Sequence, residues 1–377
     1  MTIGPSGSFD SATPVPTPHG WTPHGELTVG SEVYARDGSI TTITATLPGR
    51  VEPLFEVEFR NGETISCTSD QRWPMGEFRG IGRVSRISTI AEMLKVGLIY
   101  ERRLTSGRTK ATRGGVARWR GEPSPAVFGH HVDAGLPPYV LGYWLGDGDR
   151  DGPRITAHQA DLPSLRYQFA VEGVPLGEPK RTHGETIRVR FGSRGIAMKA
   201  LRDGNLYMNK HVPSEMLRAS LPQRWDLLQG LVDSDGSVGQ NGVVEVSLSD
   251  PGLAGGVIEL AKSLGLMPTA SVNRSYLNGE EYRMRTRIKF TPRLDEAVCR
   301  LPRKLERTRR PRRHTNPFSR SRTVVAVEPV GPSSTSSVVV EDGSHQYLVG
   351  RDFLVACDAN PGGIPGADHG RESGPTS

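Results

Sequence analysis

Two short apolar segments that each end in Asp-Gly constrain the fold of this chain more than any other feature. They span residues 140–148 (VLGYWLGDG) and 228–236 (LQGLVDSDG), each long enough for about two helical turns. Both contain a pair of small residues four positions apart: Gly142 and Gly146 in the first, Gly230 and Ser234 in the second. Residues four apart share one face of a helix, so small side chains there let two helix backbones approach closely. The pattern predicts two packed helices that end side by side in Asp147 and Asp235.

The ends of these two helices predict a metal site. Helix C-termini carry negative partial charge, so two carboxylates there repel each other unless a divalent cation joins them. A pair of buried helices that end in plain turns is the alternative, but the recurrence of the motif at a domain-like spacing favours the site. A calcium loop is excluded, because residues 147–152 (DGDRDG) mimic the start of an EF-hand but the required Glu at its twelfth position is His158.

Both segments resemble the signature motif of the LAGLIDADG homing endonucleases, the second more literally than the first. The resemblance implies that Asp147 and Asp235 bind Mg²⁺ (or Mn²⁺) and catalyse phosphodiester hydrolysis in DNA. It also implies an α+β domain with two pseudo-symmetric αββαββα repeats, at residues 138–224 and 225–314.

A third motif of that family lies between the two segments. Residues 209–213 (NKHVP) resemble the Lys-x-Ile/Val-Pro block. The resemblance implies that Lys210 lies near the scissile phosphate, where it orients water or offsets developing charge. Lys289 is the corresponding residue that we expect in the second repeat.

The expected secondary structure of the middle region repeats once. The expected elements are strands around 154–157, 186–191, 243–248 and 286–290, and helices around 162–171, from 196, around 253–264 and from 295. Apolar and basic residues alternate in the strands, which puts the basic side chains on one sheet face. We expect a saddle whose basic concave face, with Arg188, Arg190 and Arg287, lies along the DNA major groove. Basic strand residues that simply face water are the alternative.

Two arginine-rich clusters, residues 102–120 and 303–313, flank this region. Solvated linkers are one interpretation of them. The other is DNA contact, because Lys and Arg that neutralise phosphates release counterions and add salt-dependent affinity. We expect DNA contacts from these arginines: Arg102, Arg103, Arg312 and Arg313.

The N-terminal region is expected to be β-structure. Between residues 8 and 100, short β-prone segments are separated by turn signals such as Asp37-Gly38 and Asn61-Gly62. One helix is expected at residues 89–96, capped by Ser88 and ended by Gly97.

Sequence blocks at both chain ends resemble those of an intein. The matching blocks are residues 8–15 (SFDSATPV), residues 68–73 (TSDQRW), and the closing blocks 338–342, 345–350 and 353–355, which include His345. The two ends together resemble one all-β Hint-type splicing domain interrupted by the endonuclease. We therefore expect a multidomain chain: a flank at 1–7, the Hint domain at 8–100 and 315–358, a basic linker or DNA-contact region at 101–137, the endonuclease at 138–314, and a disordered tail at 359–377.

The resemblance to inteins implies that the splicing residues of this Hint-type domain are degraded. Ser8 supplies a hydroxyl at the first position and Thr68 is present, but Gln71 replaces the acid–base His. An amide does not transfer protons near neutral pH. At the far end, Asp358 replaces the cyclising Asn, and it is a poor cyclising group when ionised; Ala359 after it offers no nucleophile.

Other alignments of the C-terminal junction stay open. A terminal Asn360 is followed by Pro361, which is no nucleophile, whereas a terminal Ala356 leaves Cys357 as the nucleophile but lacks the Asn. Trp73 resembles the Trp of inteins that begin from an internal cysteine, but the matching position holds Ser337. We interpret the splicing residues Ser8, Thr68, His345, Cys357 and Asp358 as vestigial and keep partial cleavage at Ser8 open.

Composition sets the remaining limits. The 377 residues carry a formal charge of +6, and the three cysteines have no paired or metal-ligand spacing. No apolar run approaches the length of a membrane span, and the N-terminus lacks the regions of a signal peptide. We expect a soluble, cytoplasmic monomer, nucleoid-associated when bound to DNA, in a bacterial or phage context.

Three functions follow from these expectations. The favoured one is site-specific, divalent-metal-dependent cleavage of double-stranded DNA at a long target site. The first alternative is a self-splicing or self-cleaving intein with a passenger endonuclease. The second alternative is an inactive DNA-binding remnant.

Overall fold

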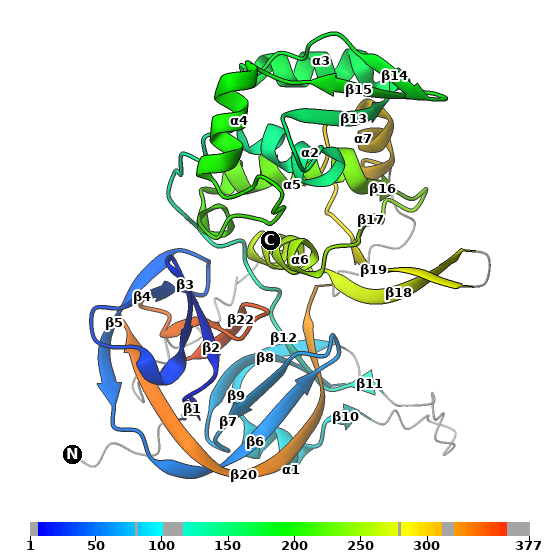
Figure 1. Cartoon of the computed structure of the whole chain (residues 1–377). Helices are drawn as coiled ribbons and strands as arrows, with labels where there is room; N and C mark the ends of the chain where they lie inside the picture. The colour runs from blue at the N-terminus through cyan, green and yellow to red at the C-terminus, as the bar shows by residue number, and fades with distance from the viewer. Residues whose placement is uncertain (1–6, 80–81, 101–115, 278–279, 311–319, 360–377) are drawn as a thin grey trace, which may run out of the picture.

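The chain folds into a β-rich domain built from both of its ends and an α+β domain built from its middle (Figure 1). The computed structural model describes residues 7–79, 82–100, 116–277, 280–310 and 320–359. This architecture agrees with the multidomain fold class expected from the sequence.

In the described residues the β-rich domain consists mostly of short strands, together with the long strand β20, one α-helix and one 3-10 turn. In chain order its elements are β1 (Phe9–Asp10), β2 (Pro14–Thr17), β3 (Gly20–Pro23), η1 (His24–Glu26), β4 (Glu32–Tyr34), β5 (Ile40–Leu47), β6 (Val51–Phe59), β7 (Thr64–Cys67), β8 (Arg72–Phe78), β9 (Arg83–Thr89), α1 (Ile90–Val96), β10 (Ile99–Tyr100), β11 (Val116–Ala117), β12 (Trp119–Gly121), β20 (Arg322–Val340), β21 (Gln346–Val349) and β22 (Leu354–Cys357). Its apolar core includes Phe9, Val57, Trp73 and Tyr347, which come from both ends of the chain.

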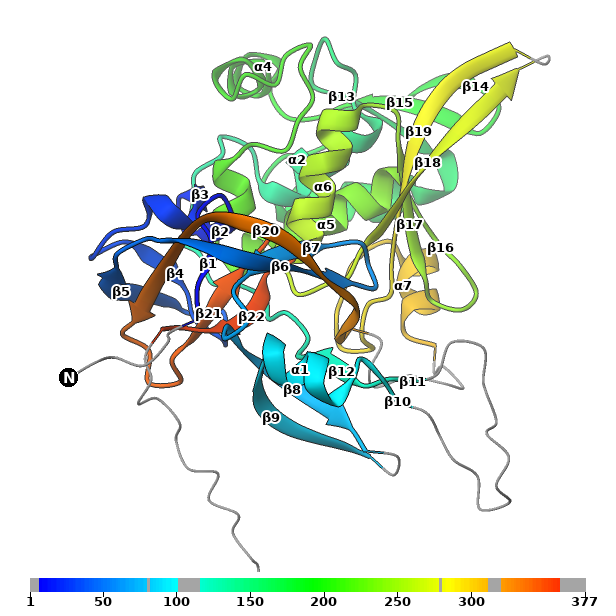
Figure 2. The ribbon, with the colours of Figure 1, turned by 90° about the horizontal axis from the view of Figure 1, so that it is seen from below.

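Strand β20 holds the two chain ends in one sheet. Along its 19 residues it pairs antiparallel with β12, β6, β1 and β5 in turn. The register shifts between Val324 and Ala326, between Pro329 and Gly331, and between Val339 and Val340. Such bulges bend a strand, and β20 curves around the domain in Figures 1 and 2. The C-terminal part of β20 thereby pairs with β1 and β5.

Two details of this domain differ from the expectation. Helix α1 is capped by Thr89 rather than Ser88, because Thr89 and Glu92 form a reciprocal capping box. Strand β12 pairs with β8 and β20, so the β-rich domain extends past the expected boundary at residue 100 into the expected linker.

The α+β domain consists of two halves that each begin with a motif helix. The first half contains α2 (Pro138–Asp147), β13 (Arg154–His158), η2 (Gln159–Asp161), α3 (Leu162–Val171), β14 (Lys180–His183), β15 (Thr186–Arg190), α4 (Arg194–Asp203) and η3 (Glu215–Arg218). The second half contains α5 (Leu221–Asp235), β16 (Gly236–Val238), β17 (Val244–Leu248), α6 (Pro251–Ser263), β18 (Thr269–Leu277), β19 (Glu280–Phe290) and α7 (Pro302–Thr308).

The two halves differ in their sheets. The first sheet has the order β13-β15-β14 and the second β16-β17-β19-β18. The second half follows the expected αββαββα order. In the first half the strand expected directly after α2 is reduced to a single bridge between Gly148 and Ile155. The exact pseudo-symmetric arrangement is therefore not confirmed.

The helix predicted from residue 295 does not form, and α7 begins instead at Pro302. The Asp233 carboxylate accepts hydrogen bonds from the N–H groups of Arg300 (2.8 Å) and Leu301 (3.1 Å), which fixes the segment before α7 in a non-helical conformation. Proline at the first helical position then starts the helix without losing an intrahelical hydrogen bond.

The two domains contact each other through aromatic and charged side chains. Trp21 of β3 donates its indole N–H to Glu259 of α6 at 2.9 Å. Arg218 pairs with the same carboxylate at 2.8 Å, and its guanidinium carbon lies 5.2 Å from the Trp21 ring centroid. Lys262 of α6 pairs with the buried Asp352 of the β-rich domain at 2.5 Å. In the described ranges no helix combines the length and the apolar character that crossing a membrane requires.

Candidate active site and splicing junctions

The motif helices α2 and α5 pack backbone to backbone through their glycines, as the small-residue pattern predicts. A Cβ atom on Gly142 would lie 2.1 Å from the carbonyl oxygen of Leu227, and one on Gly230 would lie 2.2 Å from that of Tyr139. Real Cβ atoms do not approach backbone atoms this closely, so any larger residue forces the helices apart. The two helices lie together at the centre of the α+β domain (Figure 1).

Asp147 and Asp235 are the last residues of these helices. Burial, and then the negative charge of Asp235, raises the pKa of Asp147 from 3.8 to about 6. Burial also raises the pKa of Asp235. The charges of Lys210 and Lys304 lower both pKa values but do not cancel the effect of burial. Asp147 and Asp235 thus lie in one partly buried site, and the nearby lysines neutralise only part of their negative charge. Such an arrangement is typical of a cation site.

A lysine reaches the end of each motif helix. Lys210 donates from Nζ to the carbonyl of Gly146 at 2.9 Å. Lys304, on α7, donates to the carbonyls of Val232 and Asp233 at 2.7 Å each. Burial lowers the pKa of each ammonium group from 10.5 to about 8. Lys304 thus lies near the end of α5, as Lys210 does at α2, but it is buried and contacts carbonyls two and three residues before Asp235.

Lys289, the residue expected to match Lys210, lies elsewhere. Its Nζ pairs with Glu245 at 3.1 Å on the second sheet, and 46% of its side chain is exposed. The geometry therefore favours Lys304 as the counterpart of Lys210. Sequence reasoning missed Lys304 because it grouped residues 303–313 as one basic cluster. The available signal was that Lys304 follows Asp235 at nearly the same separation as Lys210 follows Asp147.

Asp233, inside the second motif, was also missed. It is 2% exposed, and its Oδ2 accepts a hydrogen bond of 2.9 Å from the Tyr139 hydroxyl of α2. Because the same carboxylate binds the segment before α7, Asp233 links both motif helices to the element that carries Lys304.

The donors at the helix ends fit Mg²⁺. Carboxylate oxygens are hard ligands, and Mg²⁺ is usually held by one or two protein carboxylates together with water and substrate phosphates. In the part of the chain that the structure describes, no group of three or more His, Cys, Asp or Glu side chains is arranged to hold a metal. The chain thus offers the pair Asp147 and Asp235, and a cation there needs further oxygens from water or DNA.

The basic strand residues lie on the exposed face of each sheet. In β15, Ile187 and Val189 are buried, whereas Arg188 and Arg190 are exposed. In β19, Arg287 pairs with Glu245 at 3.0 Å, so this carboxylate neutralises part of the charge that Arg287 and Lys289 contribute. On the first sheet Arg188 likewise lies 3.6 Å from the Asp149 carboxylate, so each sheet places a carboxylate beside its basic side chains.

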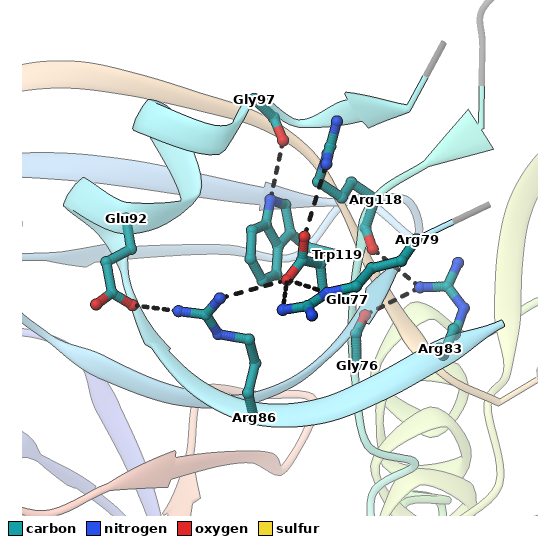
Figure 3. A network of polar contacts seen from close by, with 9 residues as sticks. All are labelled: Gly76, Glu77, Arg79, Arg83, Arg86, Glu92, Gly97, Arg118 and Trp119. Atoms are coloured by element: carbon teal, nitrogen blue, oxygen red, sulfur yellow. Dashed lines mark hydrogen bonds and ion pairs between the residues drawn. The ribbon is translucent and has the colours of Figure 1, made fainter. Parts of the chain in front are cut away.

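The junction arginines Arg102, Arg103, Arg312 and Arg313 lie outside the described residues. The end of the first cluster is described and belongs to the β-rich domain. Figure 3 shows the arginines that converge on the buried Glu77: Arg79 at 3.0 Å, Arg86 at 3.3 Å and Arg118 at 3.6 Å. Burial alone raises the pKa of Glu77, but hydrogen bonds and charges of Arg79 and Arg86 lower it overall. These arginines connect β8, β9 and the segment before β12, so they have a structural role.

At the N-terminal junction, three hydroxyl residues surround the Gly7–Ser8 peptide bond. The Ser8 N–H donates to Thr68 Oγ1 at 2.9 Å. Ser8 Oγ lies 2.7 Å from Ser337 Oγ, and the Ser337 hydroxyl donates to the Gly7 carbonyl at 3.2 Å. Ser337 is therefore in contact with both the hydroxyl of residue 8 and the carbonyl before it.

At the C-terminal junction, the residues named from the sequence also meet. Gln71 donates to the Cys357 carbonyl at 2.9 Å, so it holds the chain at the place expected for an acid–base His. His345 Nδ1 lies 3.1 Å from Asp358 Oδ2. Burial raises the pKa of the Cys357 thiol to about 12, which keeps the thiol protonated and makes it a poor nucleophile.

The family profile described as homing endonuclease matches residues 211–291, from the segment before η3 to the end of β19. The chain is 32% identical over 370 residues to the replicative DNA helicase DnaB of Mycobacterium intracellulare, a match that covers 92% of this chain and 59% of the helicase. It therefore spans less than two thirds of that relative. The endonuclease match lies inside an insertion between the two halves of the β-rich domain. The chain is an intein that carries a homing endonuclease domain. The recognition made from the sequence blocks is thereby confirmed.

The intein is also similar to solved structures over parts of its length. The MchDnaB-1 intein is 28% identical, with 29% of this chain and 73% of that chain covered and a TM-score of 0.20. Mesophilic variants of the homing endonuclease I-DmoI are 13% identical, with coverages of 46% and 96% and a TM-score of 0.32. The complex of I-DmoI with DNA and Mn is 12% identical, with coverages of 42% and 89% and a TM-score of 0.29.

Proposed function

We propose that this intein is a site-specific, divalent-metal-dependent endonuclease that cuts both strands of DNA, embedded in a Hint-type domain whose splicing residues are degraded. The observation that carries the proposal is the pair Asp147 and Asp235 at the ends of two packed helices, each end also contacted by a buried or half-buried lysine. The homing endonuclease match to residues 211–291 supports it, because that match includes the second motif helix.

The residues have distinct roles in this proposal. Asp147 and Asp235 hold Mg²⁺ or Mn²⁺, which, when bound, activates water and stabilises the leaving oxygen. Lys210 and Lys304 supply positive charge beside the phosphate, where negative charge develops during hydrolysis. Their hydrogen bonds to helix-end carbonyls orient the ammonium groups before DNA arrives.

The DNA contacts in this proposal come from the sheets. Arg188 and Arg190 on the first sheet, and Arg287 on the second, face outward and can bind phosphates or base edges along a long target. Two linked halves in one chain form the whole surface, so we propose a monomer on double-stranded DNA. Such a protein is cytoplasmic and nucleoid-associated while bound.

Cleavage of a randomised duplex library in Mg²⁺ tests the proposal, with the Asp147→Asn protein run in parallel. The expected result is cutting of both strands at one long, defined site by the unmodified protein alone. Specific binding without cutting by the unmodified protein would instead favour the DNA-binding remnant. Cutting that persists in Asp147→Asn would contradict the role of Asp147.

A second candidate function is self-cleavage at the Gly7–Ser8 bond. The contact of Ser337 with both Ser8 Oγ and the Gly7 carbonyl favours it, because a hydrogen bond to the carbonyl oxygen stabilises the negative charge that develops there when a hydroxyl attacks. Attack transfers the acyl group from nitrogen to Ser8 Oγ and forms an ester. Hydroxylamine cuts such an ester, so mass spectrometry should detect loss of residues 1–7 from the unmodified chain and not from Ser8→Ala. An unchanged mass after prolonged incubation would reject this function.

A further inference from the structure

The first motif helix carries a buried tryptophan at a position where the second motif helix carries valine. When the two motifs are aligned on Asp147 and Asp235, Trp144 of α2 corresponds to Val232 of α5. Both side chains are 0% exposed. Since valine fills this position in the second helix, burial in a motif helix does not by itself require an aromatic ring. The contacts of Trp144 indicate a further role.

The ring of Trp144 lies beside the ammonium group of Lys210. Lys210 Nζ is 5.1 Å from the ring centroid, within the range of a cation–π contact. The same Nζ donates to the Gly146 carbonyl at 2.9 Å. Burial lowers the pKa of Lys210 to about 8, so the ammonium group has lost part of its hydration. A cation–π contact is stronger for such a desolvated cation, and the ring therefore restricts where the ammonium group lies.

The indole N–H of Trp144 holds the loop that follows α2. It donates to the carbonyls at the two ends of the 149–152 segment, at 3.1 Å and 2.9 Å. Inside this segment, the Arg150 carbonyl accepts a hydrogen bond of 2.8 Å from the Met208 N–H. Met208 lies two residues before Lys210 and has a φ of 59°, a conformation that residues other than glycine rarely adopt. Trp144 thus supports both the ammonium group of Lys210 and, through the loop, the main chain before it.

We infer that Trp144 is a positioning residue for DNA cleavage and acts through Lys210. The inference rests on the proposed function, in which Lys210 supplies positive charge beside the phosphate. Trp144 is fully buried, so it does not contact DNA itself. Its ring and the Gly146 carbonyl hold the ammonium group directly beside the residue that precedes Asp147. A charge that is oriented before the substrate arrives needs no reorganisation during the reaction.

A double-mutant cycle in single-turnover cleavage tests the inference. Trp144→Leu should slow cleavage by about 10-fold, which corresponds to the loss of a desolvated cation–π contact. In the Lys210→Met background the same substitution should change the rate by less than about 2-fold, because the ammonium group that the ring holds is already absent. Slowing by the same factor in both backgrounds would overturn the inference, since Trp144 would then support only the fold.

Two further variants separate the ring contact from general packing. Trp144→Phe keeps an aromatic face and should slow cleavage by only about 3-fold. Trp119→Phe is the matched control and should leave the rate unchanged. Trp119 is also 0% exposed, donates its indole N–H to the Gly97 carbonyl at 3.0 Å and has the Arg86 guanidinium carbon 5.8 Å from its ring centroid, but it lies in the β-rich domain. Thermal unfolding shows which variants are folded. A folded Trp144→Phe that is as slow as a folded Trp144→Leu would also overturn the inference.

The position of Lys210 can also be measured without DNA. In ¹H–¹⁵N spectra of the lysine ammonium groups, the ring current of the indole should shift the Lys210 signal upfield, and Lys210→Met identifies that signal. We expect the signal to move downfield in Trp144→Leu and to stay in place in Trp119→Phe. An unchanged signal in Trp144→Leu would overturn the inference, whether or not the protein cuts DNA. An unmodified protein that shows the upfield signal but cuts no DNA would instead contradict the proposed function.

Discussion

Lys210 donates a hydrogen bond of 2.9 Å to the carbonyl of Gly146, the residue directly before Asp147. Lys304 donates to the carbonyls of Val232 and Asp233 near the end of α5, and it comes from α7, whereas Lys210 comes from the loop before η3. The paired helices thus each end in an aspartate with a lysine on the helix-end carbonyls.

Replacement of Lys304 by Met should reduce DNA cleavage by about 100-fold, as should Lys210→Met, because each removes a preorganised positive charge from the site. Lys289→Met should reduce it by less than about 10-fold, since Lys289 pairs with Glu245 on the sheet. Single-turnover cleavage rates at saturating protein measure both effects, and thermal unfolding shows which variants remain folded. If Lys289→Met loses more cleavage activity than a folded Lys304→Met, then Lys289 rather than Lys304 is the counterpart of Lys210.

The metal-free protein should lose stability as the pH rises through 6. Folding raises the pKa of Asp147 from 3.8 to about 6, so the folded state binds this proton more tightly than the unfolded state does. The contribution is fully present below pH 3.8 and lost above pH 6. Asp147→Asn should therefore unfold with a free energy about 2 kcal/mol higher than the unmodified protein at pH 7.5, and similar to it at pH 3.5.

Denaturant titrations in EDTA at both pH values measure this difference. Added Mg²⁺ should stabilise the unmodified protein and have little effect on Asp147→Asn, because a ligand stabilises only the state that binds it. If the two proteins are equally stable at pH 7.5 in EDTA, folding does not raise the pKa of the Asp147 carboxyl.

Gly230→Ala should destabilise the protein by about 1–3 kcal/mol, because the new Cβ would lie 2.2 Å from the Tyr139 carbonyl and force α2 and α5 apart. Gly255→Ala in α6 is the matched control. A Cβ there meets nothing within 4 Å, so the better helix propensity of Ala should stabilise the protein by about 0.5–1 kcal/mol. Thermal or denaturant unfolding shows whether each substitution stabilises or destabilises the protein. Equal stability changes at both sites would argue against the close packing of α2 on α5.

Arg190→Ala should weaken DNA binding and reduce the slope of log affinity against log salt by about 1, because one phosphate contact is lost. Arg166→Ala is the control, since Arg166 lies on α3 beside Glu178 rather than on the strand face. Fluorescence anisotropy at several salt concentrations measures both slopes. If Arg190→Ala leaves the slope of log affinity against log salt unchanged, Arg190 of β15 does not contact a DNA phosphate.

Local sequence patterns predicted which helices pack together and which strand face is buried in this protein. The i, i+4 small residues predicted the contact of α2 with α5, and the alternation in residues 187–190 predicted which face of β15 is buried. Both features follow from helix and strand periodicity, which a single segment contains in full. The blocks at the two chain ends likewise identified a β domain interrupted by an insertion.

Only the tertiary structure decided which distant residues share a site. Lys304 lies 71 positions from the carbonyl of Asp233 that it contacts, and Ser337 lies 329 positions from Ser8. Neither pairing has a local periodicity, because each results from how whole elements pack. The wrong helix at residue 295 has the same cause: the buried carboxylate of Asp233 binds the main chain of Arg300 and Leu301, and this long-range contact outweighs local helix propensity.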